Sequence, residues 1–321
     1  MQNIFQKKWA IISIAIFCSL LWGSAFPILK ISNVELHMPE DSPVAQMVFA
    51  GIRFLIAGLI ILVFLFLTNR NQLFVKRKQI PVLILLGFLQ TAVTYFFFYN
   101  GLAKVSGMQG SILSSSETFL TVFLAHFFYK NDRLDWKKMI GILAGLAGIM
   151  MANWGQDFQF AFQWTGEGYM IISGLVGAFA IILAKQLAID IHPFALTGWQ
   201  LTIGSLLLLL LGLPQYNDNM ITFTPLGWGL LIYAALISAV SFALWTSILK
   251  YNKAGEISIY KFLIPVFGAF LSALFVPGET LNPFIIAALA LVAIGILAVN
   301  YRGWKREKTH LPIHVKRKHI D

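Results

Sequence analysis

Apolar residues run along this chain in ten long blocks, each bounded by a short polar or turn-forming segment. A helix needs about 20 apolar residues to cross the hydrocarbon core of a bilayer. Backbone groups in lipid must be hydrogen-bonded internally, which favours helices throughout. The pattern therefore predicts an all-α polytopic membrane protein with ten transmembrane helices. The blocks are 9–31, 43–68, 80–103, 107–129, 136–154, 167–189, 193–213, 225–249, 255–276 and 283–301. The first block is too long for the apolar region of a cleaved signal, so we expect a retained span.

The second half of the chain repeats part of the first half. Residues 102–153 align with 249–300 without a gap, and each stretch ends a run of five blocks. A five-helix unit must insert in opposite orientations in its two copies, and such inverted repeats build many carriers. We therefore expect one repeat in 1–154 and a second in 155–301, followed by a basic tail in 302–321. The identical pairs are Leu102 and Leu249, Ser111 and Ser258, Ile112 and Ile259, Phe123 and Phe270, Leu124 and Leu271, Phe128 and Phe275, Leu134 and Leu281, Gly148 and Gly295, Ile149 and Ile296, and Asn153 and Asn300.

Composition and charge support this interpretation. Hydrophobic residues make up 58% of the chain and charged residues only 12%, which is typical of a membrane protein. Most Lys and Arg residues lie in one alternating set of loops and in the tail, and cytoplasmic loops carry this excess. The distribution predicts a multi-pass protein of the cell (plasma) membrane with both termini cytoplasmic. It also accounts for the net charge of +10, so we expect the lipid bilayer and no nucleic acid as a partner.

The chain lacks the usual motifs of energy coupling and metal chemistry. It contains no GxxxxGK[ST] phosphate-binding loop, which disfavours ATP-driven transport. Its histidines are scattered, and the lone Cys18 excludes an internal disulfide framework. We therefore expect no catalytic residues, no metal site and no cofactor, and we do not expect an enzyme.

Glu117, Arg53 and Lys261 are charged residues inside the apolar blocks, where a charge costs about 2.5–3.5 kcal/mol. Glu117 and Arg53 both lie near the middle of their blocks. Glu117 is expected either to handle substrate or a proton, or to form a structural ion pair with Arg53. Lys261 aligns with Ser114 of the first repeat. It either lines a cavity or extends its long side chain to the cytoplasmic surface.

Polar and aromatic residues form a stripe on the third block and another on the eighth. They recur at spacings of three and four, which places them on one face of each helix. Such faces either line a cavity for a flat, amphipathic solute or pack helices together in lipid. The resulting candidate substrate-binding residues are Trp22, Arg53, Gln90, Thr94, Tyr95, Tyr99, Ser114, Glu117, Ser241, Trp245 and Lys261.

Small residues gather on the fifth and tenth blocks. Gly141 and Gly145 form a small-xxx-small face, and Ala288, Val292 and Gly295 occupy similar positions on the tenth block. These faces indicate close helix contact, either within one chain or in a homodimer.

Several motifs resemble those of a known family. Residues 21–30 (LWGSAFPILK) resemble the opening motif of EamA-type carriers of the drug/metabolite transporter superfamily, and 51–55 (GIRFL) is similar to their arginine motif. Glu117 and Thr118 stand where the family usually carries Glu-Pro, and Pro265 aligns with that proline in the second repeat. Residues 278–279 (GE) also resemble the family pattern. The resemblance implies ten helices, two EamA repeats and export of small metabolites or drugs.

These observations predict a secondary membrane transporter that exports small amphipathic metabolites, amino acids or drugs by alternating access. Proton coupling through Glu117 and passive equilibration both remain open. The first alternative is a non-transporting membrane scaffold or sensor. The second is a membrane enzyme acting on lipid-linked substrates. Its acidic loop residues would have to converge, yet Asp132 and Glu279 are expected on opposite sides of the membrane.

Overall fold

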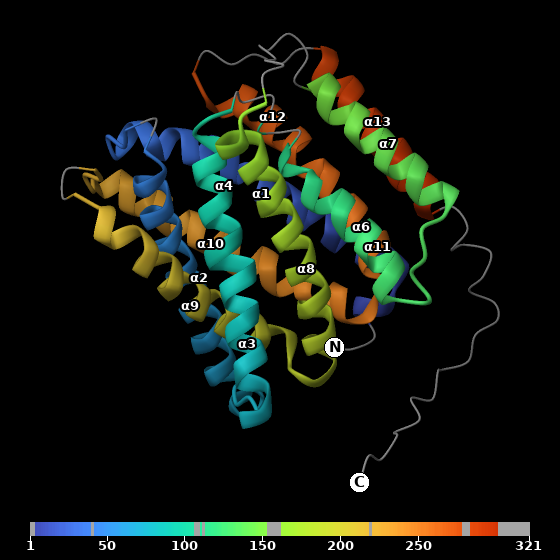
Figure 1. Cartoon of the computed structure of the whole chain (residues 1–321), viewed down its shortest axis with the longest axis horizontal. Coiled ribbons are helices and arrows are strands. Elements are labelled where there is room, and N and C mark those ends of the chain that lie inside the picture. Colours follow the sequence, from blue (N-terminus) through green and yellow to red (C-terminus); the bar gives the residue numbers. More distant parts are fainter. Residues whose placement is uncertain are drawn as a thin grey trace.

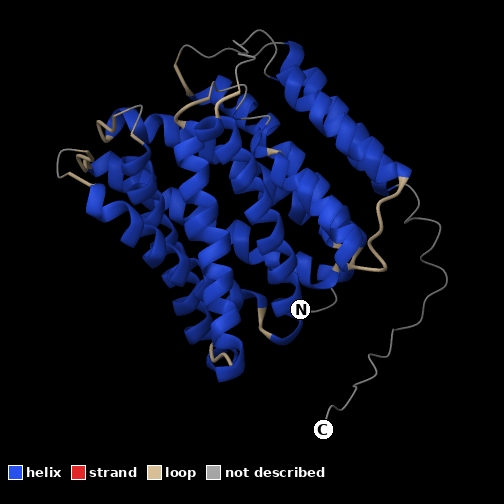
Figure 2. Cartoon of the chain, viewed as in Figure 1, coloured by secondary structure: helices blue, strands red, loops and turns tan. Residues whose placement is uncertain are grey.

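A computed structural model describes residues 4–39, 42–105, 110, 113–152, 162–217, 220–277 and 283–300. The described residues form helices joined by short loops, without a β-strand among them (Figure 2). The main elements are α1 (Lys8–Glu35), α2 (Pro43–Asn69), α3 (Ile80–Gly87), the π-helix η4 (Phe88–Val93), α4 (Thr94–Leu102), α6 (Ser116–Phe128), α7 (Trp136–Ala152), the π-helix η5 (Trp164–Gly168), α8 (Tyr169–Asp190), α9 (Pro193–Gly212), α10 (Pro225–Tyr251), α11 (Ala254–Ser258), the 3₁₀ helix η7 (Ile259–Phe262), α12 (Leu263–Phe275) and α13 (Pro283–Asn300). Short 3₁₀ turns cover Ile4–Gln6, Arg70–Gln72, Arg77–Gln79 and Leu213–Gln215.

These elements make ten helical segments in the described part of the chain. Seven continuous stretches are long and apolar enough to cross a bilayer, and α6, α7 and α13 are shorter. Large apolar side chains such as Leu67, Phe127 and Leu210 are exposed on the outside, where lipid would cover them. The predicted all-helical membrane fold with ten helices is confirmed.

The packing of the helices follows the duplication in the sequence. Helix α1 packs against α12, and α8 packs against α6 (Figure 1). Continuing the repeat alignment makes α8 the counterpart of α1, and α6 the counterpart of α12. Helix α2 likewise packs against its counterpart α9, and α7 packs against its counterpart α13. Exchanging the halves therefore turns the α1–α12 contact into the α8–α6 contact. The α2–α9 and α7–α13 contacts map onto themselves, as expected for two copies of a duplicated unit that pack against each other.

The small-residue faces of α7 and α13 meet each other within one chain, and the two helices lie side by side in Figure 1. A methyl group added at Gly295 would lie 3.1 Å from the carbonyl oxygen of Gly141. One added at Gly148 would lie 3.1 Å from the carbonyl oxygen of Ala288. The glycines thus allow the two backbones to approach closely. Intramolecular packing occupies the faces that the sequence also offered for a homodimer.

The ninth span is helical over Ala254–Phe275, close to the predicted 255–276, but it is not α-helical throughout. It consists of α11, the 3₁₀ segment η7 and α12. Pro265 supplies a physical reason, because its ring clashes with the carbonyl four residues earlier and its nitrogen donates no hydrogen bond. In the first half, α6 begins at Ser116, the position aligned with the first residue of α12. The two halves therefore share a helix start at the same depth, although Thr118 replaces the proline.

The third span contains a π-helix, which inserts a wider turn over Phe88–Val93. The hydroxyl of Thr94 donates to the carbonyl of Leu89 at 2.7 Å, across this turn. The amide nitrogen of Gln200 donates to the hydroxyl of Thr91 at 2.7 Å. The bond from Gln200 joins the third span to α9, and the bond from Thr94 lies within the third span.

Candidate functional site

An ion pair connects the two halves at the helix starts just described. Glu117 lies in the first turn of α6, and Lys261 lies in η7 before α12. The Lys261 Nζ donates to the Glu117 Oε1 at 2.6 Å. The Glu117 and Lys261 side chains are 25% and 14% exposed, so the pair is neither fully buried nor on the surface. Glu117 rests on α8, where a methyl group added at Gly177 would lie 2.6 Å from its Oε2.

This pair bears on two sequence-based interpretations, the ion pair between Glu117 and Arg53 and the position of the Lys261 side chain. Within the described residues Glu117 pairs with Lys261, so the structural pair expected with Arg53 does not form. The Lys261 side chain is mostly buried, which favours the alternative that it lines the interior of the protein. Its ammonium group points to a carboxylate on the other half because the 3₁₀ turn before Pro265 carries it toward α6.

Two tryptophans cover the lysine of this pair. The Lys261 Nζ lies 5.5 Å from the ring centre of Trp22 on α1 and 5.3 Å from that of Trp245 on α10. The two indole rings are themselves 5.4 Å apart in an edge-to-face arrangement. A cation over an aromatic face is stabilised by about 0.5–2 kcal/mol, depending on how far it is desolvated. The rings therefore compensate part of the cost of holding Lys261 in the membrane interior.

Further aromatic rings join this pair to Arg53. Phe242 lies 5.3 Å from Trp22 and 6.1 Å from Phe54, measured between ring centres. The guanidinium carbon of Arg53 lies 4.3 Å from the ring centre of Phe54. Tyr95 packs against Phe54 at 4.6 Å. The charged and aromatic groups of both halves therefore form one connected set.

Tyr95 on α4 adds the third span to this set through its contact with Phe54. We call the whole arrangement the central cluster, and its members are Trp22, Arg53, Phe54, Tyr95, Glu117, Phe242, Trp245 and Lys261. Six spans from both halves contribute to it.

The other predicted residues lie around or beside the central cluster. Tyr99 is buried, with its ring 5.9 Å from that of Tyr95. Ser241 is buried beside Phe242 on α10. Thr94 directs its hydroxyl back to its own helix, while Gln90 lies half-buried in the π-helix. Ser114 is half-buried just before α6. Their roles in substrate binding stay predictions.

The sequence-based candidates omit two members of the cluster, Phe54 and Phe242. Phe54 directly follows Arg53 in the GIRFL motif, and Phe242 belongs to the aromatic stripe of the eighth span. Both signals were therefore present. What the sequence did not show is that these two rings face each other between the two halves.

A second ion pair lies at one end of the bundle. The Lys138 Nζ donates to the Asp132 Oδ1 at 2.5 Å and to the carbonyl of Arg133 at 2.9 Å. The backbone N–H of Gly255, in the first turn of α11, donates to the other Asp132 oxygen at 2.8 Å. Burial, and next the charge of Asp132, raise the pKa of nearby Tyr129 to about 12. Asp132 is thus a buried link between the halves, not a freely exposed loop residue.

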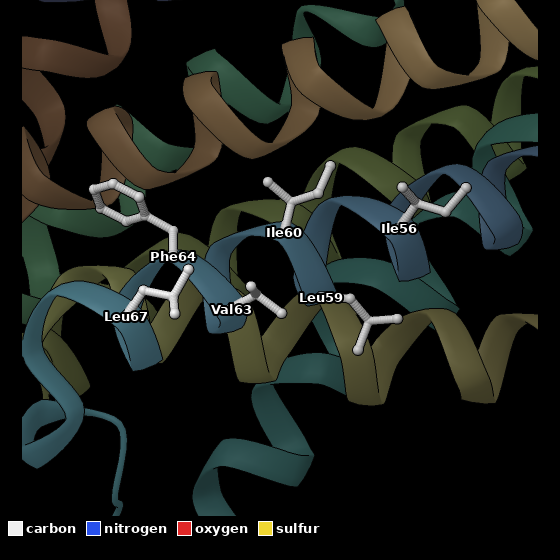
Figure 3. A pocket seen from close by; sticks show the side chains of 6 residues that line it. All are labelled: Ile56, Leu59, Ile60, Val63, Phe64 and Leu67. Carbon is white, nitrogen blue, oxygen red and sulfur yellow. The ribbon is translucent and has the colours of Figure 1, made fainter.

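An apolar groove runs along the outer face of α2, and no member of either ion pair lines it (Figure 3). Figure 3 shows aliphatic and aromatic side chains along it, and the groove offers almost no polar surface. Such a surface suits lipid acyl chains and offers nothing to orient a polar solute. Its lining residues are Ile56, Leu59, Ile60, Val63, Phe64 and Leu67. Among the described residues, no group of three histidine, cysteine or acidic side chains is placed to hold a metal ion.

Fold and site thus define a helical membrane protein with a charged, aromatic cluster between duplicated halves. The model of the EamA-like transporter family matches residues 9–154 and 164–301. The chain therefore belongs to the EamA-like transporter family, which is a family of transporters and not of enzymes.

Individual relatives agree with this assignment. The chain is 24% identical to the probable amino-acid metabolite efflux pump of Salmonella typhimurium over 92% of this chain and 96% of that protein. It is 24% identical to the uncharacterized transporter YvbV of Bacillus subtilis over 94% of both chains. It is 26% identical to the uncharacterized inner membrane transporter YedA of Escherichia coli over 87% of both chains. A crystal structure with 15% identity matches 94% of this chain and all of its own, with a TM-score of 0.77, which shows a shared fold.

Proposed function

We propose that this protein is a secondary carrier that exports small amphipathic metabolites by alternating access, with amino acids and drugs among the candidate classes. The observation that carries the proposal is the Glu117–Lys261 pair, which joins the halves at their aligned helix starts. Carriers built from repeats bind substrate near the midplane, often at interrupted helices. The printed name of the Salmonella relative is compatible with this class of cargo.

The central cluster suggests how the halves could be released from one another. When the halves separate at this point, the bond between the Lys261 Nζ and the Glu117 Oε1 must break. Protonation of Glu117 removes the negative charge that holds Lys261, while Trp22 and Trp245 continue to face the ammonium group. A proton gradient can then favour one conformation by protonating Glu117 from one side. This scheme makes Glu117 the coupling residue.

The same proposal includes topology and domain boundaries. The excess of Lys and Arg in one alternating set of loops supports cytoplasmic termini and a location in the plasma membrane. The repeats are proposed to cover 1–154 and 155–301, and the tail 302–321 lies outside the described residues.

The test of proton coupling uses proteoliposomes with and without an imposed pH gradient. A wild-type substrate is first found by comparing extracellular metabolites of cells with and without the protein. We expect Glu117→Gln to reduce gradient-driven flux at least about tenfold, because the amide cannot exchange the proton. Glu256→Gln is the matched control, since Glu256 pairs with Lys253 where both side chains are more than 40% exposed. Unchanged gradient-driven flux in Glu117→Gln would contradict the coupling role.

A further inference from the structure

Arg53 is a buried cation that has no hydrogen-bonding partner within the described chain. The residue is only 6% exposed, and its Nε atom is enclosed and makes no hydrogen bond. Arg53 also forms no ion pair with an acidic side chain among the described residues. An arginine guanidinium stays protonated under physiological conditions and has five donors and no acceptor. A buried charge of this kind normally pairs with an anion.

Glu117, the acidic member of the central cluster, does not pair with Arg53. Glu117 binds Lys261 at 2.6 Å, so its charge is already balanced by another cation. Arg53 and Lys261 together carry two positive charges against the one negative charge of Glu117. The described central cluster is therefore one negative charge short of neutrality. A ligand with one net negative charge would supply it.

Two further buried donors lie in the same neighbourhood. The Nε1 of Trp245 and the Oγ of Ser241 make no hydrogen bond in the described chain. They stand one turn apart on α10, on either side of Phe242, whose ring faces Trp22 and Phe54. A buried donor without an acceptor costs about 1–3 kcal/mol. Indole N–H groups donate only, which makes an acceptor-rich ligand group the natural partner.

The rest of the central cluster is apolar and flat. Phe54, Phe242 and Trp22 are in edge-to-face contact and would favour an aromatic or similarly flat ligand body. We propose that the central cluster binds amphipathic organic monoanions, and that Arg53 receives their carboxylate or equivalent acidic group. This inference rests on the proposed carrier function only for the claim that the anion is also transported.

The net charge of a ligand should determine how well it binds the central cluster. A zwitterionic amino acid would need an anionic partner for its ammonium group, and Glu117 supplies one only after it leaves Lys261. A simple amine would add a third positive charge to the cluster. A monoanion leaves the Glu117–Lys261 pair intact and neutralises Arg53.

Four probes with the same phenylpropyl body separate these cases. They are 3-phenylpropionate, 3-phenylpropanamide, phenylalanine and 3-phenylpropylamine. Binding is measured with the purified full-length protein in lipid nanodiscs, as the ligand concentration needed for half-maximal thermal stabilisation. We expect 3-phenylpropionate to act at a concentration at least about tenfold lower than the other three.

Variants of Arg53 then assign the preference to this residue. Arg53→Gln should remove the preference for the carboxylate over the amide, and Arg53→Lys should retain part of it. Arg70→Gln is the matched control, because Arg70 directly follows the same helix and is exposed. The thermal measurement itself shows whether each variant is folded. If Arg53→Gln does not fold, the wild-type ranking and Arg53→Lys still decide.

Three results would overturn the inference: a wild-type preference for the amine or the amino acid, no response to 3-phenylpropionate, or a folded Arg53→Gln that keeps the carboxylate preference. Flux of the same probes in proteoliposomes is a separate readout. Binding of the carboxylate without any flux supports the anion site and contradicts the carrier. Flux of another probe without carboxylate preference supports the carrier and contradicts the anion site.

Discussion

Two lysine–carboxylate pairs lie at contacts between the halves of this protein, and their surroundings differ. The Asp132–Lys138 pair is enclosed, with side chains 1% and 4% exposed, and both partners make further hydrogen bonds to the backbone. The Glu117–Lys261 pair is more accessible, and aromatic rings replace the additional hydrogen bonds of Lys261 in the described structure. The Asp132–Lys138 pair resists separation because breaking it would leave buried groups without their hydrogen-bonding partners. The second can open with fewer bonds lost.

This difference suggests two roles for the pairs, one in stabilising the fold and one in the conformational change of transport. Asp132 accepts a hydrogen bond from the first turn of α11, where a carboxylate also complements the helix dipole. The contact fastens the loop after α6 to the ninth span. Farther along these same two spans, Glu117 and Lys261 meet through a single hydrogen bond. The comparison predicts that changes at the first pair affect mainly folding and that changes at the second affect mainly transport.

The largest expected effect is on stability, at the enclosed pair. Asp132→Asn should lower the free energy of unfolding by about 3–5 kcal/mol, because Lys138 keeps a buried charge without its partner. Thermal unfolding of the purified protein measures the loss. Replacing both residues, in Asp132→Asn with Lys138→Met, should recover part of it. If Asp132→Asn lowers the free energy of unfolding by less than about 1 kcal/mol, the Asp132–Lys138 pair is no more important for stability than the Glu117–Lys261 pair.

Glu117→Gln should have a smaller effect on stability than on transport. We expect a loss of about 1 kcal/mol, because the pair is partly exposed and Lys261 retains both indole rings. The same thermal measurement applies, alongside the proteoliposome flux. If Glu117→Gln is destabilised as much as Asp132→Asn, the Glu117–Lys261 pair also contributes mainly to the stability of the fold.

Trp22→Leu tests the indole rings that face Lys261. Leucine keeps an apolar side chain but removes the aromatic face 5.5 Å from the ammonium group. The expected loss of stability is about 0.5–1 kcal/mol, and we expect it to shrink when Lys261→Met is already present. The double-mutant cycle of thermal stability measures this coupling. Simple additivity of the two changes would argue against a contact between the ring and the charge.

The smallest expected effect concerns pH at the ends of the helices. Burial, and next the charge of Lys250, lower the pKa of His192, which precedes α9, below its ordinary value of 6.5. The unfolded chain then binds this proton more tightly, so stability falls as pH decreases through 6.5 toward the folded-state pKa. His192→Gln should flatten this part of the stability profile by a few tenths of a kcal/mol, about the size of a weak electrostatic effect. An unchanged slope between pH 7 and pH 5 would exclude this contribution.

Much of the fold could be predicted because bilayer thickness and turn chemistry leave clear signals. Helices α2, α9, α10 and α13 begin at Pro43, Pro193, Pro225 and Pro283, as the hydrophobic blocks predict. Proline suits the first turn of a helix, where its missing N–H is not needed. The 3₁₀ segment before Pro265 and the π-helix at Phe88–Val93 were not predicted. Contacts between spans, such as the bond between Gln200 and Thr91, stabilise such irregular turns, and periodicity does not reveal these contacts.

The site was predicted by residue type more than by arrangement. Charge at membrane depth identified Glu117, Arg53 and Lys261 as candidates. The alignment placed Lys261 opposite Ser114, only three positions before Glu117, but an alignment does not state which helices face one another. That information comes from the packing of α6 against α11 and η7, which lie far from α6 in the sequence.

The interlocked packing of the halves also constrains the order of assembly. Helix α1 is synthesised well before the ninth span, yet the two are in close contact. The hydroxyl of Ser19 donates to the carbonyl of Tyr260. A methyl group added at Gly23 would lie 2.7 Å from the Cβ of Phe267. Until the ninth span is made, α1 lacks this partner. The first half therefore lacks part of its final packing until the ninth span has been synthesised and inserted. Separately expressed halves would have to find each other before either could reach its final packing.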